Sequence, residues 1–172
     1  LGGKFKFKEK LSGRLADVLI HLYMCSAMLK RFEDDGRPEA DLPLLNWAME
    51  DSLYIIQQSL LGVLRNLPLP FIGRILRVVV FPFGVPYCGP SDKAVKAVAK
   101  LLLNESPSRD RLTAGVFVSD RDDASGRVHK AFHLVLQAAP AEQAIKNALK
   151  ESVNIENYEG LVKRATESGV IT

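Results

Sequence analysis

The sequence predicts an all-α protein, an antiparallel helical bundle with a long irregular polar loop. Apolar residues recur at alternating steps of three and four over several long stretches, which is typical of helices that bury one face. Turns rich in glycine, proline and acidic residues separate these stretches, and no two segments have the alternating pattern of paired strands. With 172 residues, 47% of them hydrophobic and 25% charged, the chain has the size and composition of one globular domain.

The first long helix is expected between residues 11 and 32. Its apolar stripe consists of Leu11, Leu15, Val18, Leu22, Cys25, Leu29 and Phe32. Leu19, Tyr23 and Met28 widen this stripe beyond the seam of a coiled coil, which indicates several neighbours. The glycine and proline of the turn at residues 36–38 then end the helix.

A second helix is expected to begin near Asp41, a natural N-cap, with Pro43 tolerated in its first turn. Its stripe consists of Met49, Leu53, Ile56, Leu60, Val63 and Leu67, and the "LPLP" stretch ends it. Because the connection between the two helices is short, they should be antiparallel neighbours. We expect one core that contains Leu15, Val18, Leu22, Met49, Leu53 and Ile56.

After residue 87 the sequence predicts one more helix, a loop and a helical tail. Residues 1–103 are expected to form the bundle core, and the last helix of this part starts at the cap Ser91. Residues 104–127 are polar and punctuated, so an irregular loop is expected there. Residues 128–172 should supply C-terminal helices of the same domain. These are expected at 128–139, at 141–151 after Pro140, and at about 155–168, where Gly169 closes the last one.

The composition excludes several classes of function. The net charge is only +3 and the basic residues form no stripe, so nucleic-acid binding is not expected. Cys25 and Cys88 make no disulfide framework, and Cys25 is expected to be a buried thiol. The chain begins with "LGGKFKFKEK", without a signal peptide or an initiator methionine, so we expect it to be a piece of a longer polypeptide.

Residues 67–87, "LPLPFIGRILRVVVFPFGVPY", are apolar except for Arg74 and Arg77. A membrane-spanning helix needs about 20 apolar residues, whereas the arginines interrupt the first half here and prolines break the second. We therefore expect a short amphipathic helix from Phe71 to about Val80, followed by an apolar loop.

Two interpretations of this stretch stay open. The helix covers the core of the bundle, or it lies in a membrane interface with its arginines against anionic head groups. The candidate membrane-interface residues are Phe71, Ile72, Arg74, Ile75, Arg77, Phe81 and Phe83.

The residues of this chain predict no catalytic, cofactor-binding or metal site. His129 and His133 are four positions apart on a predicted helix, but no third ligand is evident nearby, so ordinary histidines are favoured over a metal site. Capping alone explains Ser91 at the start of its helix. The sequence has no glycine-rich phosphate loop.

Residues 9–60 and the stretch "VVVFPFGVPYCGPSDK", residues 78–93, resemble the C-terminal extension of the bacterial FadE-type (long-chain) acyl-CoA dehydrogenase. The motifs that carry the resemblance are Arg14-Leu15, Leu22-Tyr23, Leu29-Lys30-Arg31, Gly36-Arg37, Ala40-Asp41-Leu42-Pro43 and Pro90-Ser91-Asp92-Lys93. The first helix pair is more distantly similar to the extra C-terminal domain of very-long-chain acyl-CoA dehydrogenase. The remaining chain matches by helical character alone.

The resemblance implies a non-catalytic domain of an FAD-dependent enzyme of fatty-acid β-oxidation, which oxidises acyl-CoA to trans-2-enoyl-CoA. It implies membrane association and packing against the catalytic part, with long-chain acyl-CoA as the parent's substrate and a homodimer as a further assembly. FAD is implied for the parent enzyme and not for this chain. The implied location is the bacterial cytoplasm, peripheral at the inner membrane. The alternative is a free-standing helical lipid-binding or adaptor bundle without enzyme activity.

The same resemblance bears on Glu159. In that family a glutamate in a Tyr-Glu-Gly motif takes the α-proton of the substrate while the flavin takes the β-hydride. Tyr158-Glu159-Gly160 has the same letters but comes after the extension instead of before it, and the residues that follow do not continue the motif. We therefore expect Glu159 to be an exposed residue near a helix start and the catalytic base to lie outside this chain.

Overall fold

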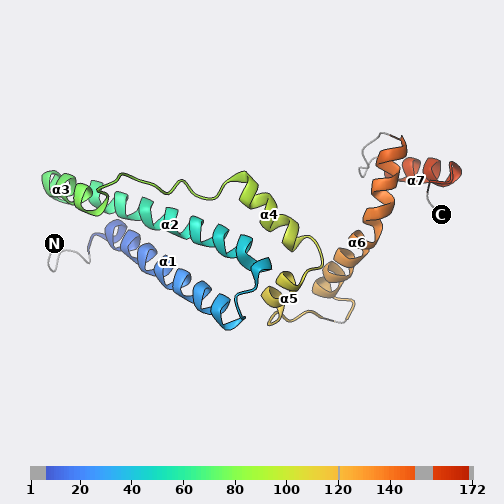
Figure 1. Cartoon of the computed structure of the whole chain (residues 1–172), viewed down its shortest axis with the longest axis horizontal. Coiled ribbons are helices and arrows are strands. Elements are labelled where there is room, and N and C mark those ends of the chain that lie inside the picture. Colours follow the sequence, from blue (N-terminus) through green and yellow to red (C-terminus); the bar gives the residue numbers. More distant parts are fainter. Residues whose placement is uncertain (1–6, 120, 150–156, 171–172) are drawn as a thin grey trace. The chain divides into compact units, whose positions relative to one another are not determined.

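The computed structural model describes residues 7–119, 121–149 and 157–170. Within these ranges the chain forms seven α-helices and one short 3-10 helix, and no strand (Figure 1). The predicted all-α class is therefore confirmed. The chain divides into two compact units, Leu1–Leu112 and Thr113–Thr172. The grouping of the C-terminal helices with the bundle in one domain stays a prediction.

The first unit is built on a hairpin of two long helices, α1 (Glu9–Asp34) and α2 (Leu42–Arg65), joined through the 3-10 turn η2 (Glu39–Asp41). Gly36 ends α1 as predicted, because its positive φ of 81° lets the chain turn back on the helix. The amide of Gly36 donates to the Glu33 carbonyl and that of Arg37 donates to the Phe32 carbonyl. This pair of bonds is a Schellman motif, which satisfies carbonyls at the end of the helix.

Leu11, Cys25 and Leu61 are the buried apolar residues of this hairpin, so the buried thiol predicted at Cys25 is confirmed. The prediction for Leu22 is wrong, because its side chain is 49% exposed. Among the described helices only α2 packs closely along α1, and a single neighbouring helix cannot cover the full width of the apolar stripe. The other residues of the expected core, Leu15, Val18, Met49, Leu53 and Ile56, are half-buried.

After α2 the chain turns sharply into α3 (Pro70–Val80), as predicted for the stretch from Phe71 to Val80. Gly73 is the buried residue of α3 and lies directly against the end of α2. A Cβ atom at this position would stand 2.3 Å from the carbonyl oxygen of Leu64. Only glycine therefore lets α3 approach the backbone of α2 so closely.

An extended segment leads from α3 back along α2 to α4 (Asp92–Leu102), as Figure 1 shows. Ser91 caps α4 as predicted, because its Oγ accepts a hydrogen bond of 3.3 Å from the amide of Ala94. The prediction of an irregular loop over residues 104–127 is wrong in part. That segment contains α5 (Pro107–Thr113) and the first residues of the next helix.

The second unit contains α6 (Ala124–Leu149) and α7 (Tyr158–Glu167). Two helices separated at Pro140 were expected, but α6 continues through this proline. Ile145, five residues later, packs with Leu161 and Ala165 of α7 in a buried cluster. This packing stabilises the continued helix and offsets the backbone hydrogen bond that Pro140 cannot donate. The end of α7 at Gly169 is confirmed, whereas the helix boundaries predicted at residues 151 and 155 lie outside the described residues.

Candidate interaction site

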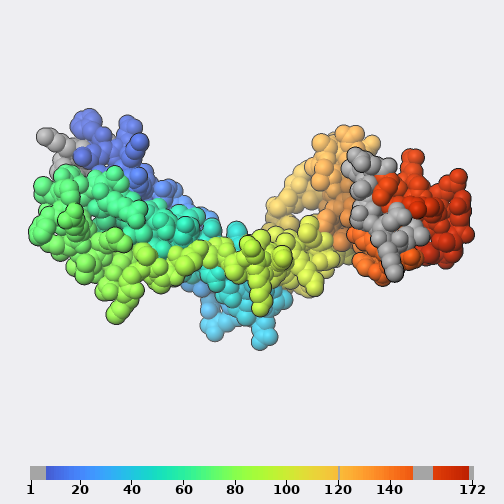
Figure 2. Space-filling model, turned by 90° about the horizontal axis from the view of Figure 1, so that it is seen from above, coloured from blue at the N-terminus to red at the C-terminus, as the bar shows by residue number. Residues whose placement is uncertain are grey.

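The apolar residues of α3 face away from the rest of the first unit. Phe71, Ile72, Ile75, Val78 and Val79, here called the apolar edge, share one face of α3, and all are exposed. Phe71 is 72% exposed and Val79 is 69% exposed, while the buried Gly73 lies on the opposite face, against α2. Figure 2 shows α3 and the segment after it, in green, lying open on the surface of the unit. In the described structure this face of α3 therefore does not cover the core of the first unit.

The two arginines and two phenylalanines predicted for the same site occupy different positions. Arg74 and Arg77 are exposed and lie on the flank of α3, between the apolar edge and the side that meets α2. Phe83 is 98% exposed in the segment after α3, whereas Phe81 is half-buried and does not lie open. The structure thus supports an apolar face with a cationic flank.

The extended segment after α3 is fixed to α2 by one side chain. Gln57 is 2% exposed, and its amide nitrogen donates to the carbonyl oxygen of Tyr87 at 2.7 Å. The amide of Tyr87 in turn donates to Oε1 of Gln57 at 3.0 Å. Gly89, with a φ of 80°, packs on the ring of Tyr54. A glutamine side chain thereby replaces the backbone partner that this segment would find in a sheet.

The outer face of α1 is also apolar. Leu19, Ile20 and Tyr23 are exposed on the side of α1 that points away from α2, and Tyr23 is 77% exposed. The buried Leu11 and Cys25 occupy the opposite side of the same helix. A helix that is apolar on both sides is typical of one that packs on both sides. This face is therefore a second candidate interaction surface.

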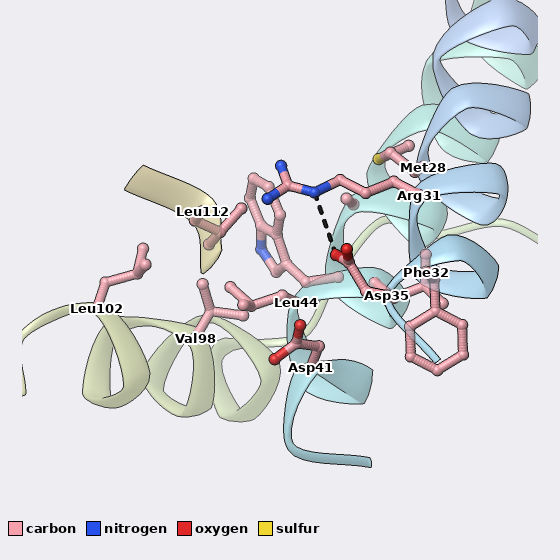
Figure 3. A pocket seen from close by; sticks show the side chains of 12 residues that line it. Met28, Arg31, Phe32, Asp35, Asp41, Leu44, Val98, Leu102 and Leu112 are labelled. Carbon is pink, nitrogen blue, oxygen red and sulfur yellow. Dashed lines mark ion pairs between the residues drawn. The ribbon is translucent and has the colours of Figure 1, made fainter. Parts of the chain in front are cut away.

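A cavity of about 270 Å³ opens where α1, α2, α4 and α5 meet (Figure 3). Its apolar lining consists of Met28, Phe32, Leu44, Leu45, Trp47, Ala48, Val98, Leu102 and Leu112, and its charged lining consists of Arg31, Asp35 and Asp41. Nine of the twelve lining residues are apolar, so the cavity has the character of a site for an apolar group.

An ion pair holds α5 against the start of α2 beside this cavity. The Arg111 guanidinium donates from Nε to Oδ2 of Asp41 at 3.0 Å and from Nη2 to Oδ1 at 2.6 Å. Arg31 of α1 donates to the carbonyl oxygen of Arg111 and pairs with Asp35 at 3.5 Å. Asp41 is the residue before α2, as predicted, but its carboxylate makes no capping bond to the helix.

The same contacts lower the pKa of Asp41 below its ordinary value. The hydrogen bonds from Arg111 are the main cause, the Ser108 hydroxyl and the charge of Arg31 act in the same direction, and partial burial opposes them. A carboxyl group with a lowered pKa stabilises the folded state above its unfolded-state pKa. This contribution is lost as the pH falls through the folded-state value.

Asp41→Asn should therefore lower the free energy of unfolding at pH 7 by about 1 kcal/mol, the value typical of a partly exposed ion pair. The difference from the wild type should shrink as the pH falls through the acidic range in which Asp41 takes up a proton. Urea unfolding at a series of pH values measures both effects. Asp17→Asn, at an exposed position of α1, is the control and should show neither. A pH-independent loss in Asp41→Asn would contradict the role of the carboxylate charge.

The other residues singled out in the sequence do not join this site. The Nε2 atoms of His129 and His133 lie 3.2 Å apart, so the two rings contact each other on α6. In the described ranges no group of three or more His, Cys, Asp and Glu side chains could hold a metal ion. Glu159 is exposed in the first turn of α7, as expected. Cys25 and Cys88 are both free thiols.

The cavity between α1, α2, α4 and α5 does not fit FAD. The cavity is smaller than the usual range for small-molecule sites, which begins at about 300 Å³. Its charged residues are engaged in ion pairs with each other and with Arg111, so they form no cradle for phosphate groups.

In the described part of the chain, no helix combines the length and the apolar character that a membrane crossing requires.

A comparison with protein families matches the chain over residues 1–172 to the family described as "Acyl-CoA dehydrogenase, C-terminal, bacterial type". No solved structure matches the chain. The family match covers the tail as well as the first half, where the motifs of the resemblance lie.

Proposed function

We propose a function for this chain on the ground that it belongs to the bacterial-type acyl-CoA dehydrogenase C-terminal family. It is the non-catalytic helical domain of an FAD-dependent enzyme, and it attaches that enzyme to a membrane surface. The parent enzyme would oxidise long-chain acyl-CoA to trans-2-enoyl-CoA. The domain would place it at the inner membrane of a bacterium, on the cytoplasmic side, without crossing the bilayer.

The orientation of α3 supports the membrane attachment. The five residues of the apolar edge point away from the bundle, so a membrane could bury them while the domain stays folded. A short amphipathic helix with such a face lies in the plane of the interface, with the apolar side among the acyl chains. Arg74 and Arg77, on the flank, would then lie at the level of the head groups, where each contributes roughly 1 kcal/mol near an anionic surface.

The outer face of α1 supports packing on the catalytic part of the enzyme. Leu19, Ile20 and Tyr23 form an apolar surface, and Lys30, which lines a shallow depression together with Tyr23, is paired with Asp34. An interface within a protein favours such an uncharged centre, in which aromatic residues are enriched. We assign α1 to the catalytic part and α3 to the membrane because α3 carries Arg74 and Arg77 beside its apolar face, whereas Lys30 beside Tyr23 on α1 is paired with Asp34.

Vesicle binding by the full-length enzyme tests this function. The enzyme should co-sediment with vesicles of phosphatidylcholine and, more strongly, with vesicles that also contain phosphatidylglycerol. The additional binding to anionic vesicles should vanish at about 1 M salt, where the Debye length is about 3 Å, while the apolar contribution remains. An enzyme that stays in the supernatant with both kinds of vesicle at low salt would overturn the membrane role.

A further inference from the structure

We propose that the cavity between α1, α2, α4 and α5 binds a small uncharged hydrocarbon group. The cavity lies on the hairpin end of the first unit, and its walls come from residues 28–48, 98–102 and 112. These segments are distant in sequence, so the cavity exists only in the folded unit. It is separate from the apolar edge, because no residue of α3 lines it.

The chemistry of the walls selects an apolar occupant. The nine apolar lining residues include Trp47, whose indole nitrogen is buried and has no hydrogen-bond partner in the described ranges. Because this nitrogen is not accessible from the cavity, it offers no donor to a ligand. A hydrocarbon group would gain dispersion contacts with walls that otherwise face an empty or wet space.

The charged residues of the cavity select an uncharged occupant. Arg31, Asp35 and Asp41 line the cavity and Arg111 pairs with Asp41, so the charges of these two cations and two anions sum to zero. Asp41 is engaged by Arg111 through two hydrogen bonds, and Arg31 is engaged by Asp35 and by the Arg111 carbonyl. A charged ligand would lose its hydration without finding an unpaired partner, which is costly.

The cavity is also held open without a ligand. The ion pair between Arg111 and Asp41 fixes α5, which contributes Leu112 to the wall, against the start of α2. Binding therefore needs little reorganisation. The volume of about 270 Å³ leaves room for a group of several carbon atoms.

Fluorescence titration of the 172-residue chain tests this inference, because Trp47 is its only tryptophan and lines the cavity. 1-Octanol should change the Trp47 emission saturably and raise the melting temperature by mass action. Octanoate and octyltrimethylammonium should bind at least tenfold more weakly. Octanoate binding as tight as octanol binding would overturn the selection against charge, and a linear change with every probe would overturn the site.

Two variants keep the test independent of folding. Ala48→Phe should fill the cavity and weaken octanol binding at least tenfold, whereas Ala16→Phe, at an exposed position of α1, should leave it unchanged. Leu112→Ala should enlarge the cavity and shift the preference from octanol toward decanol. Equal octanol binding by wild type and a folded Ala48→Phe, or an unchanged chain-length preference in Leu112→Ala, would overturn the proposal.

A further probe distinguishes two sources of the hydrocarbon group, the tail of an amphiphile and a small free molecule. Octyl glucoside carries the same eight-carbon tail on a bulky head group that must stay outside the cavity. Binding of octanol and octyl glucoside alike identifies the tail of an amphiphile as the ligand, and binding of octanol alone identifies a small free molecule. Loss of octanol binding in the full-length enzyme would instead assign the cavity to a side chain of the catalytic part and overturn the proposal.

Discussion

Gln57→Ala should lower the free energy of unfolding by about 2 to 3 kcal/mol and release the extended segment at residues 81–90 from α2. The substitution removes two hydrogen bonds, each with a net worth of about 1 kcal/mol, and truncates a side chain that is almost fully buried. The amide and carbonyl of Tyr87 lose their only described partners, so the segment should separate from the helix to reach water. Urea unfolding and hydrogen exchange of the Tyr87 amide measure the two effects.

Gln58 provides a matched control one residue away. Its side chain is exposed on the same helix, so Gln58→Ala should change the free energy of unfolding by less than about 0.5 kcal/mol. Gln57→Glu should be intermediate or worse, because the carboxylate can accept from the Tyr87 amide but cannot donate to its carbonyl. Equal stability of Gln57→Ala and Gln58→Ala would show that the segment is held by other contacts.

Features that depend on a few neighbouring residues were predictable from the sequence. The two long helices, the ends at Gly36 and Gly169 and the cap at Ser91 follow from periodicity and local hydrogen bonding. The existence of α3 was predictable for the same reason. Such features are determined within about one helical turn, so the rest of the fold cannot easily override them.

Features that depend on tertiary partners were not predictable. Gln57 and Tyr87 are 30 positions apart, and Asp41 and Arg111 are 70 positions apart, so no local pattern signals either contact. Leu22 belongs to a regular stripe, but the stripe does not say how many helices cover it. Pro140 is a strong local signal to end a helix, and it failed because packing between α6 and α7 favours the continued helix.

The direction in which the apolar face of α3 points also depends on a tertiary partner. Its amphipathic pattern fits a face against the core and a face against lipid equally well, so periodicity could not choose between them. The deciding residue is Gly73, which brings the opposite face of α3 onto α2 and thereby turns the apolar edge outward. A glycine on the face opposite the apolar residues of an amphipathic helix is a weak signal in a sequence, but it marks the side of close backbone approach.

Paired substitutions on α3 should separate the charged and apolar contributions to membrane binding. Arg74→Glu with Arg77→Glu should weaken binding to anionic vesicles at least about 30-fold at low salt, because two contributions of roughly 1 kcal/mol become repulsive. This loss should shrink as salt is added. Phe71→Ser with Ile72→Ser removes two apolar side chains, so it should weaken binding about 100-fold or more with little dependence on salt.

Both double variants should fold normally, because all four side chains are exposed and the close contact of α3 with α2 is made by Gly73. Circular dichroism and urea unfolding, measured beside vesicle co-sedimentation of the full-length enzyme, check this expectation. Arg121→Glu with Arg127→Glu, in the second unit, carries the same change of charge and should retain most of the binding. If the serine pair unfolds the domain and the glutamate pair binds vesicles like the wild type, α3 stabilises the bundle and the membrane role is wrong. If both pairs lose vesicle binding while their free energies of unfolding stay unchanged, the apolar edge and its cations contact the membrane and do not stabilise the bundle.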